Sequence, residues 1–260
     1  MNDALINLLG DELYTAAKEC RALEPLTSRH ADLTIDDAYR IQQCVNARRI
    51  EAGERMIGKK IGVTSQVVMD MLGVYQPDFG MLSDAMLYRK GEAIPAVSLI
   101  QPKAEGEIAF VLRHDLQGPG VTAADVLAAT EGVMACFEIV DSRIKDWKIR
   151  IEDTVADNAS CGVFVLGERM VDPRTVDLVD CAMTLEKNGD VVTTGTGAAA
   201  LGNPLEAVAW LANKLGQLNE PLRAGDVVLS GSLAAMVPVA AGDSLKVSID
   251  GIGSCSVRFV

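Results

Sequence analysis

The hydrophobic pattern of this chain changes once, near residue 56, and that change limits the folds open to it. Before it, apolar residues recur at helical spacing, which predicts a helix over residues 3–22. A second helix is predicted from Thr34, which has Asp37 three residues on in a pattern similar to a capping box, to a stop at Gly53. After residue 56, short apolar runs alternate with Gly, Pro and Asp, which is typical of strands and turns.

Strands dominate this second part. They are expected at residues 57–63, 107–113, 133–140, 161–166, 179–187, 190–194, 226–230, 244–249 and 255–259. The pair Asn188-Gly189 is a strong signal for a type I′ hairpin between two of them. Two helices interrupt the strands, one beginning at Thr122 and one at Asn203-Pro204.

Regular alternation of strand and helix is absent, which argues against a doubly wound sheet. We therefore expect an α+β fold that forms one structural domain, with a helical section over residues 1–55 and a β-rich part over residues 56–260.

Charge and cysteine usage narrow the functional class. The chain carries 24 basic and 36 acidic residues, a formal charge of −12, which argues against a nucleic-acid partner and against docking on an anionic membrane. No apolar stretch is long enough to cross a bilayer, and the first residues show no signal-peptide core. We expect a cytoplasmic protein with free thiols, because no C-x-x-C pair occurs among Cys20, Cys44, Cys136, Cys161, Cys181 and Cys255.

Two glutamates share one face of a predicted strand. In the segment Lys103–Leu112, Glu105 and Glu107 are two residues apart, so their side chains point the same way with Cα atoms ~6.6 Å apart. Both can reach one cation between them. A solvated strand face would give the same pattern, so the pair alone leaves both interpretations open.

A third carboxylate lies in a strand that is apolar on both sides. Glu138 must be neutral, paired or metal-bound if that strand is buried, because an isolated buried charge is costly. Placed beside Glu105 and Glu107, it would complete an all-oxygen site suited to Mg²⁺ or Mn²⁺. A core ion pair is the alternative.

Each of the other candidate residues also has an ordinary structural interpretation beside a functional one. Lys60, flanked by Gly58 and Gly62, could approach a ligand closely or be a surface lysine. Asp78 lies in an expected turn, Gln76–Gly80, and the run from Asp153 to Cys161 is expected to be a polar loop that leads into a strand. Arg143 could hold a substrate carboxylate or neutralise the nearby Asp141. The G-x-G-x-x-A run at 195–200 lacks the strand–helix context of a nucleotide site, and two isolated histidines make a Ser-His-Asp triad improbable.

Several segments together resemble the fumarylacetoacetate hydrolase superfamily, and within it the branch of 2-hydroxypentadienoate hydratases and 4-oxalocrotonate decarboxylases. The matching segments are G-K-K-I-G-V-T at 58–64, Q-P-D-F-G at 76–80, P-K-A-E-G-E-I-A-F-V-L at 102–112, F-E-I-V-D-S-R at 137–143, D-T-V-A-D-N-A-S at 153–160, L-G-N-P-L at 201–205 and D-G-I-G-S-C-S-V-R-F at 250–259. The resemblance implies a mixed β-roll of the C-terminal-domain type of this family as the catalytic part. It also implies a divalent cation, Mg²⁺ or Mn²⁺, on Glu105, Glu107 and Glu138.

The same resemblance implies roles for the remaining candidates. Lys60 and Asp78 fall on catalytic positions, where Lys60 would stabilise an enolate or, if burial lowers its pKa, donate a proton. We expect substrate contacts from Arg143, Ser160 and Ser232. A homo-oligomer is implied, with a complex with a pathway decarboxylase or aldolase as a further expectation. Asn203 replaces a His found in many relatives, at a position that we interpret as a helix N-cap.

The implied activity is metal-dependent hydration of 2-hydroxypenta-2,4-dienoate, a 2-oxopent-4-enoate tautomer, to 4-hydroxy-2-oxopentanoate in aromatic meta-cleavage catabolism. Residues 76–80 and 142–147 favour the hydratases. The alternatives are decarboxylation of 4-oxalocrotonate, hydrolytic cleavage of an acylpyruvate, and a non-catalytic partner that stabilises a pathway decarboxylase.

Overall fold

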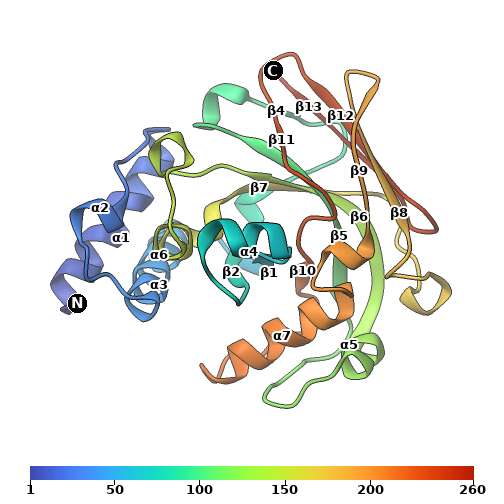
Figure 1. Cartoon of the computed structure of the whole chain (residues 1–260), viewed down its shortest axis with the longest axis horizontal. Coiled ribbons are helices and arrows are strands. Elements are labelled where there is room, and N and C mark those ends of the chain that lie inside the picture. Colours follow the sequence, from blue (N-terminus) through green and yellow to red (C-terminus); the bar gives the residue numbers. More distant parts are fainter.

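The computed structural model describes the backbone of residues 1–260 and all side chains except those of Val67, Met71 and Leu72. Two sheets and seven α-helices are the main elements of the described chain (Figure 1). The helices are α1 (Asp3–Lys18), α2 (Leu26–Arg29), α3 (Ile35–Glu51), α4 (Gln66–Leu72), α5 (Ala123–Ala129), α6 (Ile151–Ala156) and α7 (Pro204–Gly216). Among the described parts of the chain, no helix has the length and apolar character needed to span a membrane.

The larger sheet is mixed and curled, and it contains the candidate site. Its strand order is β2-β1-β10-β5-β6-β7-β3, with β11 also paired to β5. The strands are β1 (Met56–Gly62), β2 (Asp78–Ser83), β3 (Leu87–Tyr88), β5 (Lys103–Leu112), β6 (Thr130–Val140), β7 (Cys161–Leu166), β10 (Val227–Leu229) and β11 (Val237–Pro238).

The smaller sheet has the order β4-β13-β12-β8-β9. Its strands are β4 (Ala93–Ile94), β8 (Ala182–Lys187), β9 (Asp190–Thr196), β12 (Ser244–Ile249) and β13 (Gly253–Phe259). The predicted hairpin is confirmed, because β8 pairs with β9 and both Asn188 and Gly189 have the positive φ that a type I′ turn requires.

The main core lies between the two sheets and α7. Even-numbered residues of β5, such as Ile108 and Phe110, are buried there with Phe137 of β6, Val247 of β12 and Leu211 of α7. Odd-numbered residues of β5 point to the other face of the sheet, as strand alternation dictates. That second face is also covered, and it carries the carboxylates.

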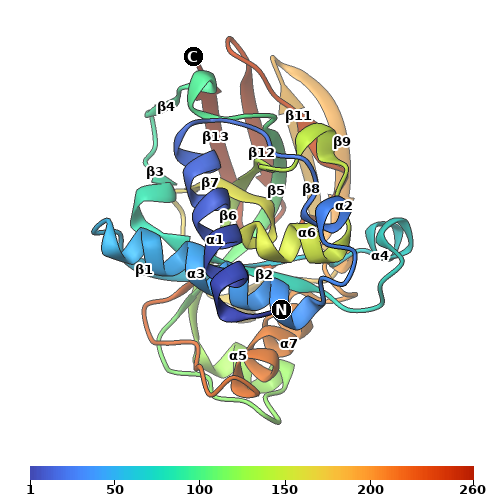
Figure 2. The ribbon, with the colours of Figure 1, turned by 90° about the vertical axis from the view of Figure 1, so that its left-hand side faces the viewer.

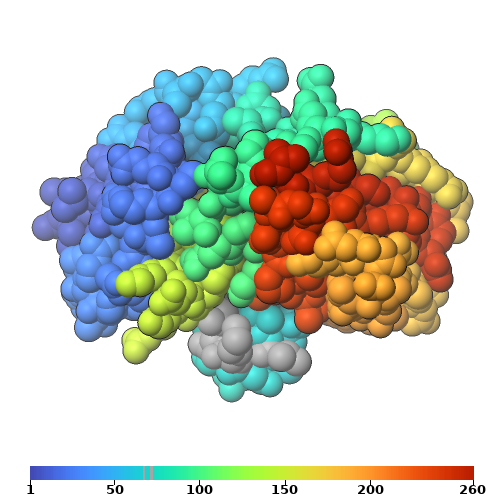
Figure 3. All heavy atoms as spheres, turned by 90° about the horizontal axis from the view of Figure 1, so that it is seen from above, coloured from blue at the N-terminus to red at the C-terminus, as the bar shows by residue number. Residues whose placement is uncertain are grey.

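The N-terminal helices form a second apolar cluster with α6. Figure 2 shows α1, α3 and α6 on one side of the molecule, and Figure 3 shows the helical section and the smaller sheet at opposite ends. The predicted start of α3 is confirmed, because the Thr34 side chain accepts a hydrogen bond from the Asp37 backbone N–H. Leu13 and Ile41 pack with Val155, so this cluster fixes the position of α6 and of the loop after it.

Two local predictions are wrong. The expected turn at Gln76–Gly80 contains the beginning of a strand, β2. The backbone at Gly80 lies so close to Asn158 that a Cβ on Gly80 would be 2.4 Å from the Asn158 carbonyl oxygen. The polar segment after residue 150 forms a helix, α6. Its Asp153 is buried because it accepts hydrogen bonds from Thr27 Oγ1 and the Thr27 N–H.

Candidate metal centre and active site

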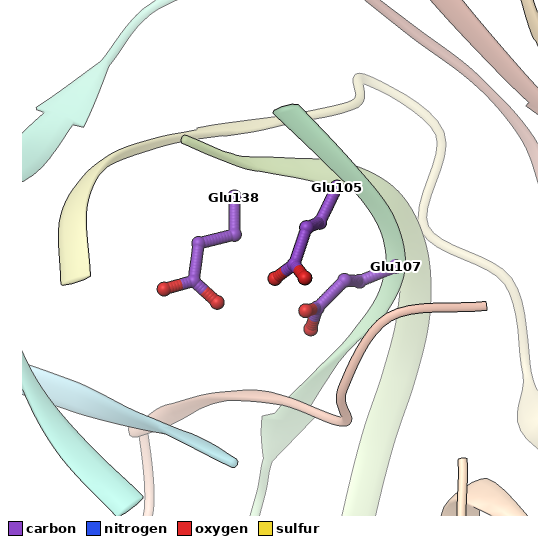
Figure 4. A group of neighbouring side chains, drawn as sticks. All are labelled: Glu105, Glu107 and Glu138. Carbon is purple, nitrogen blue, oxygen red and sulfur yellow. The ribbon is translucent and has the colours of Figure 1, made fainter. Parts of the chain in front are cut away.

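Strand register assembles three carboxylates. Glu105 of β5 pairs directly with Glu138 of β6, and Glu107 lies two residues farther along β5 on the same face. One carboxylate oxygen from each residue lies within 4.8 Å of the others. Figure 4 shows the three side chains converging on one point. The backbone therefore places Glu105 and Glu107 on one face of β5, as the sequence predicted.

These carboxylates fit a hard divalent cation. Glu107 and Glu138 are fully buried, and within the described part of the chain neither Glu107 Oε1 nor Glu138 Oε2 has a hydrogen-bond partner. The Gly231 N–H donates to Glu107 Oε2 at 2.9 Å. Burial first, and the neighbouring negative charges second, raise the pKa of Glu105 to about 7 and that of Glu107 well above its ordinary value. Unpartnered buried oxygens of this kind are the ligands that Mg²⁺ and Mn²⁺ prefer.

Lys60 is the neighbouring cation. Its Nζ lies 3.1 Å from Glu138 Oε1 and donates to the Ala159 carbonyl oxygen at 3.0 Å. Burial alone would lower the pKa of Lys60, but the charges of Glu138, Asp78 and Glu105 outweigh burial and raise it. The condition under which Lys60 would donate a proton, a pKa lowered by burial, is therefore not met. Lys60 is an ammonium ion held among carboxylates.

Asp78 is the second titratable group beside this cluster. It begins β2 and is 1% exposed, and neither of its carboxylate oxygens has a hydrogen-bond partner among the described residues. Burial raises its pKa to about 6, although Lys60 opposes the shift. A carboxyl group with a pKa near neutrality can both take and return a proton.

Gly62 leaves the space that Asp78 occupies. A Cβ on Gly62 would lie 2.2 Å from Asp78 Oδ1 and 3.3 Å from Lys60 Nζ. Gly62→Ala is therefore expected to displace the Asp78 carboxylate and to lower turnover by about 10²-fold, the loss typical of a mispositioned catalytic group. The control is Ser256→Ala, which also places an alanine in a strand but at an exposed position of β13. Unchanged turnover in Gly62→Ala would contradict this placement of Asp78.

A cavity of about 450 Å³ opens beside the cluster. The charged and hydroxyl-bearing residues around it are Lys60, Thr64, Ser65, Asp78, Glu105, Thr154, Ser160 and Ser232. Sequence reasoning had proposed Ser160 and Ser232 as substrate contacts, and the structure places both on the cavity wall. It had missed Thr154, whose hydroxyl lies 3.2 Å from that of Ser160. The available signal was the polar segment 153–160, which was interpreted as a loop.

Arg143 does not line the cavity. It is buried and forms an ion pair with Asp157, and its guanidinium also donates to the carbonyl oxygens of Asp141, Asp157 and Cys161. The Asp141 carboxylate instead accepts the N–H groups of Ile100 and Gln101. Neither expected role, substrate contact or neutralisation of Asp141, matches this placement. Arg143 instead ties the end of β6 to the start of β7.

Metal affinity is expected to rise with pH. Because the raised pKa values of Glu105 and Glu107 keep protons on the metal-free site near neutrality, a binding cation must displace them. Affinity should increase by about tenfold per pH unit for each proton displaced, and the contribution of Glu105 should level off above about pH 7. Calorimetry with Mn²⁺ from pH 6 to pH 8 in buffers of different ionisation enthalpy measures both the affinity and the protons released. A pH-independent affinity would contradict this prediction.

The curled sheet carries three converging carboxylates, and a buried lysine, an aspartate and a cavity lie beside them. This arrangement is typical of enzymes that act on small molecules at a cation site. The chain belongs to the fumarylacetoacetate hydrolase family. Residues 59–260 match the family described as fumarylacetoacetate (FAA) hydrolase C-terminal, and the predicted fold is confirmed.

Curated relatives identify the branch. The chain is 58% identical over 256 residues to a 2-hydroxyhexa-2,4-dienoate hydratase of Comamonas testosteroni, covering 98% of this chain and 97% of that protein. It is 64% identical over 217 residues to a 2-hydroxypent-2,4-dienoate hydratase of Pseudomonas putida, covering 83% and 98% respectively. These names place the chain among hydro-lyases, as the sequence predicted.

A solved structure is also similar. The 4-oxalocrotonate decarboxylase from Pseudomonas putida G7, complexed with magnesium and adipate, has a TM-score of 0.97 and 37% identity. The alignment covers 100% of this chain and 99% of that one. The backbone alone therefore does not separate hydratases from decarboxylases in this branch.

Proposed function

We propose that the protein hydrates 2-hydroxypenta-2,4-dienoate to 4-hydroxy-2-oxopentanoate with a divalent cation, Mg²⁺ or Mn²⁺, held by Glu105, Glu107 and Glu138. The observation that carries this proposal is the convergence of these three carboxylates beside Lys60 and Asp78 at the wall of one cavity. The hydratase relatives support the reaction, and the magnesium named for the decarboxylase supports the cation.

The reaction rearranges protons around one addition of water. The C2 hydroxyl loses its proton, C5 gains one, and water then adds its oxygen at C4 and a proton at C3. When bound, the cation supplies Lewis-acid stabilisation of the negative charge that develops on substrate oxygen. The proton transfers and the binding of the substrate must come from the side chains around the cavity.

Asp78 is the residue suited to proton transfer, because its pKa of about 6 lets it exchange a proton near neutral pH. Lys60 supplies a fixed positive charge that favours an anionic substrate and the anionic intermediate. Ser160 and Ser232 are placed to hydrogen-bond the substrate.

Decarboxylation of 4-oxalocrotonate is the second candidate, because of the structural likeness. Its substrate carries a second carboxylate that needs a cationic partner in the pocket. Among the described side chains that line the cavity, Lys60 is the only cation, and Glu138 already engages it. This favours the hydratase.

The complete carboxylate cluster likewise argues against a non-catalytic partner role. Homo-oligomerisation and a complex with a pathway decarboxylase or aldolase stay predictions.

The test is a product assay with purified, metal-depleted protein. Freshly generated 2-hydroxypenta-2,4-dienoate and 4-oxalocrotonate are supplied separately, with Mg²⁺, with Mn²⁺ and with chelator, and products are identified by mass. We expect gain of one water from the monoacid only when a cation is present. Carbon dioxide loss from the diacid without hydration of the monoacid would establish the decarboxylase instead, and no turnover of either would leave the non-catalytic role.

A further inference from the structure

We infer that Asn158 is a positioning residue whose side-chain amide clamps the turn Asn158–Ser160 onto β2, so that the Ala159 carbonyl oxygen fixes the Lys60 ammonium group at the cavity. Asn158 does not itself line the cavity, so it acts through Ala159 and Lys60. This inference rests on the proposed function and deepens it, because it names what holds one of the residues that would act on the substrate.

The turn Asn158–Ser160 has an unusual backbone. Asn158, Ala159 and Ser160 have φ values of 55°, 52° and 51°, so three successive residues are left-handed and none of them is glycine. Asn adopts this conformation more readily than most residues, but in Ala159 and Ser160 it places the Cβ close to a carbonyl oxygen. Such a backbone persists only where the surrounding contacts enforce it. The contacts of the turn therefore explain its conformation.

The Asn158 amide provides the contact with β2. This strand is at the edge of the larger sheet. Asn158 Oδ1 accepts a hydrogen bond from the Met81 N–H at 2.8 Å, and its Nδ2 donates to the Met81 carbonyl oxygen at 2.9 Å. The amide therefore takes the place that a neighbouring strand would occupy. This pairing needs an acceptor and a donor on one side chain, which an amide has and a carboxylate lacks.

Strand register then brings the turn to Lys60. Lys60 of β1 is directly opposite Gly80 of β2, so its side chain lies on the face that Gly80 leaves open. The Asn158 carbonyl oxygen lies against that same face, because a Cβ on Gly80 would collide with it. The next carbonyl oxygen, that of Ala159, accepts the hydrogen bond from Lys60 Nζ at 3.0 Å. The clamp at Met81 thus sets the position of this acceptor relative to the lysine.

The Ala159 carbonyl matters because it is a neutral acceptor. Lys60 Nζ carries three N–H groups, and its described partners are Glu138 Oε1 at 3.1 Å and the Ala159 carbonyl oxygen. Lys60 also lines the cavity, so one N–H group is available to a bound anion. A cation held by Glu138 would repel the ammonium group. The Ala159 carbonyl would then keep the ammonium group in place beside the substrate.

The turn is tied to the rest of the chain at both ends without Asn158. Asp157, which precedes it, forms an ion pair with Arg143, and the Ser160 carbonyl oxygen accepts the Asp141 N–H at 2.8 Å. Neither contact reaches β2. Removal of the Asn158 amide is therefore expected to release the turn from β2 while the chain still folds.

Amine labelling of metal-free Asn158→Gly tests the clamp directly. Glycine adopts the left-handed backbone freely and lacks the amide. Acetylation with acetic anhydride, located by mass spectrometry, reports how firmly each lysine is held. We expect Lys60 to react at least fivefold faster than in the wild type, and Lys59, the adjacent residue paired with Asp226, to change less than twofold. Asn219→Gly makes the same change at an exposed left-handed position and should leave both rates unchanged.

Kinetics of the metal-loaded variant test the consequence for the reaction. The kcat for 2-hydroxypenta-2,4-dienoate should fall at least tenfold in Asn158→Gly, the loss expected of a mispositioned charge. The Mn²⁺ affinity should change less than threefold, because the three carboxylates are untouched. Asn219→Gly should retain both values.

The outcomes separate positioning from general stability. Equal acceleration of Lys59 and Lys60 labelling would give Asn158 only a structural role, and unchanged Lys60 labelling or unchanged kcat would likewise overturn the inference. If Asn158→Gly does not fold, Asn158→Asp decides: it keeps the acceptor and loses the donor, and Lys60 should react at least twofold faster than in the wild type. A wild-type protein without turnover, but with Lys60 labelling that responds to Asn158→Gly, would contradict the proposed function and support the clamp.

Discussion

Replacing Glu105 with Gln is expected to lower kcat/KM by about 10³-fold while leaving the fold intact. The substitution keeps the size of the side chain but removes one of three carboxylates that converge within 4.8 Å. Lewis-acid stabilisation supplies several kcal/mol, and about 4 kcal/mol corresponds to about 10³ in rate. Glu105 is also the carboxylate of the three that lines the cavity, so its loss affects the position nearest the substrate.

Two measurements separate this prediction from a general loss of structure. Mn²⁺ affinity, measured by calorimetry, should fall together with kcat/KM, while the circular dichroism spectrum stays unchanged. Glu131→Gln is the matched control, since it makes the same change at an exposed position on β6. A Glu105→Gln protein with full activity and full metal affinity would exclude the carboxylate cluster as the cation site.

The part of this site that sequence could predict is the part governed by strand alternation. Glu105 and Glu107 had to share a face of any strand that contained both, and the structure places them so. The pairing of Glu105 with Glu138 depends on the register of two strands that are distant in sequence. No local pattern specifies that register, so the residues alone left a shared site as one of two interpretations, and the resemblance to the family favoured it.

Sequence reasoning did worse where long-range contacts decide the role of a polar residue. Arg143 was expected in the substrate pocket, but Asp157, fourteen residues away, pairs with it in the interior. The charge state of Lys60 shows the same limit. Burial alone would lower its pKa, and only the three surrounding carboxylates, from three different strands, reverse the direction.

The order of helices and strands was easier to predict from the sequence, because helix caps and turns depend on residues that are close together in the chain. Thr34 and Thr122 cap the helices that they were predicted to begin, and Asn203 caps α7. Strand β2 was missed since it is buried on both sides and contains Asp78, Gly80 and Ser83, which are typical of turns. Its place in the sheet comes from pairing with β1 along its whole length.

Replacing Lys60 with Met is expected to destabilise the metal-free protein by about 3 kcal/mol or more, the usual result of removing one partner of a buried ion pair. Lys60 and Glu138 are both almost fully buried, so removal of the ammonium group leaves the Glu138 carboxylate in the interior without its counter-charge. Because Lys60 lowers the pKa of Glu138 and of Glu105, its removal raises both further. The destabilisation should therefore shrink as pH falls and the carboxylates become protonated.

A divalent cation should restore much of this stability in Lys60→Met, because it neutralises the same carboxylates and binds only the folded state. At 100 times its Kd, such a ligand adds about 2.7 kcal/mol. Lys59→Met is the matched control: Lys59 is the adjacent residue of β1, and its partner is Asp226 at 3.0 Å, outside the cluster. Thermal unfolding with and without Mn²⁺ should show a larger metal-induced rise in Tm for Lys60→Met than for Lys59→Met. Activity should be lost in Lys60→Met at saturating metal and retained in Lys59→Met. Equal metal responses in the two variants would mean that Lys60 stabilises the fold without sharing the charge of the cation site.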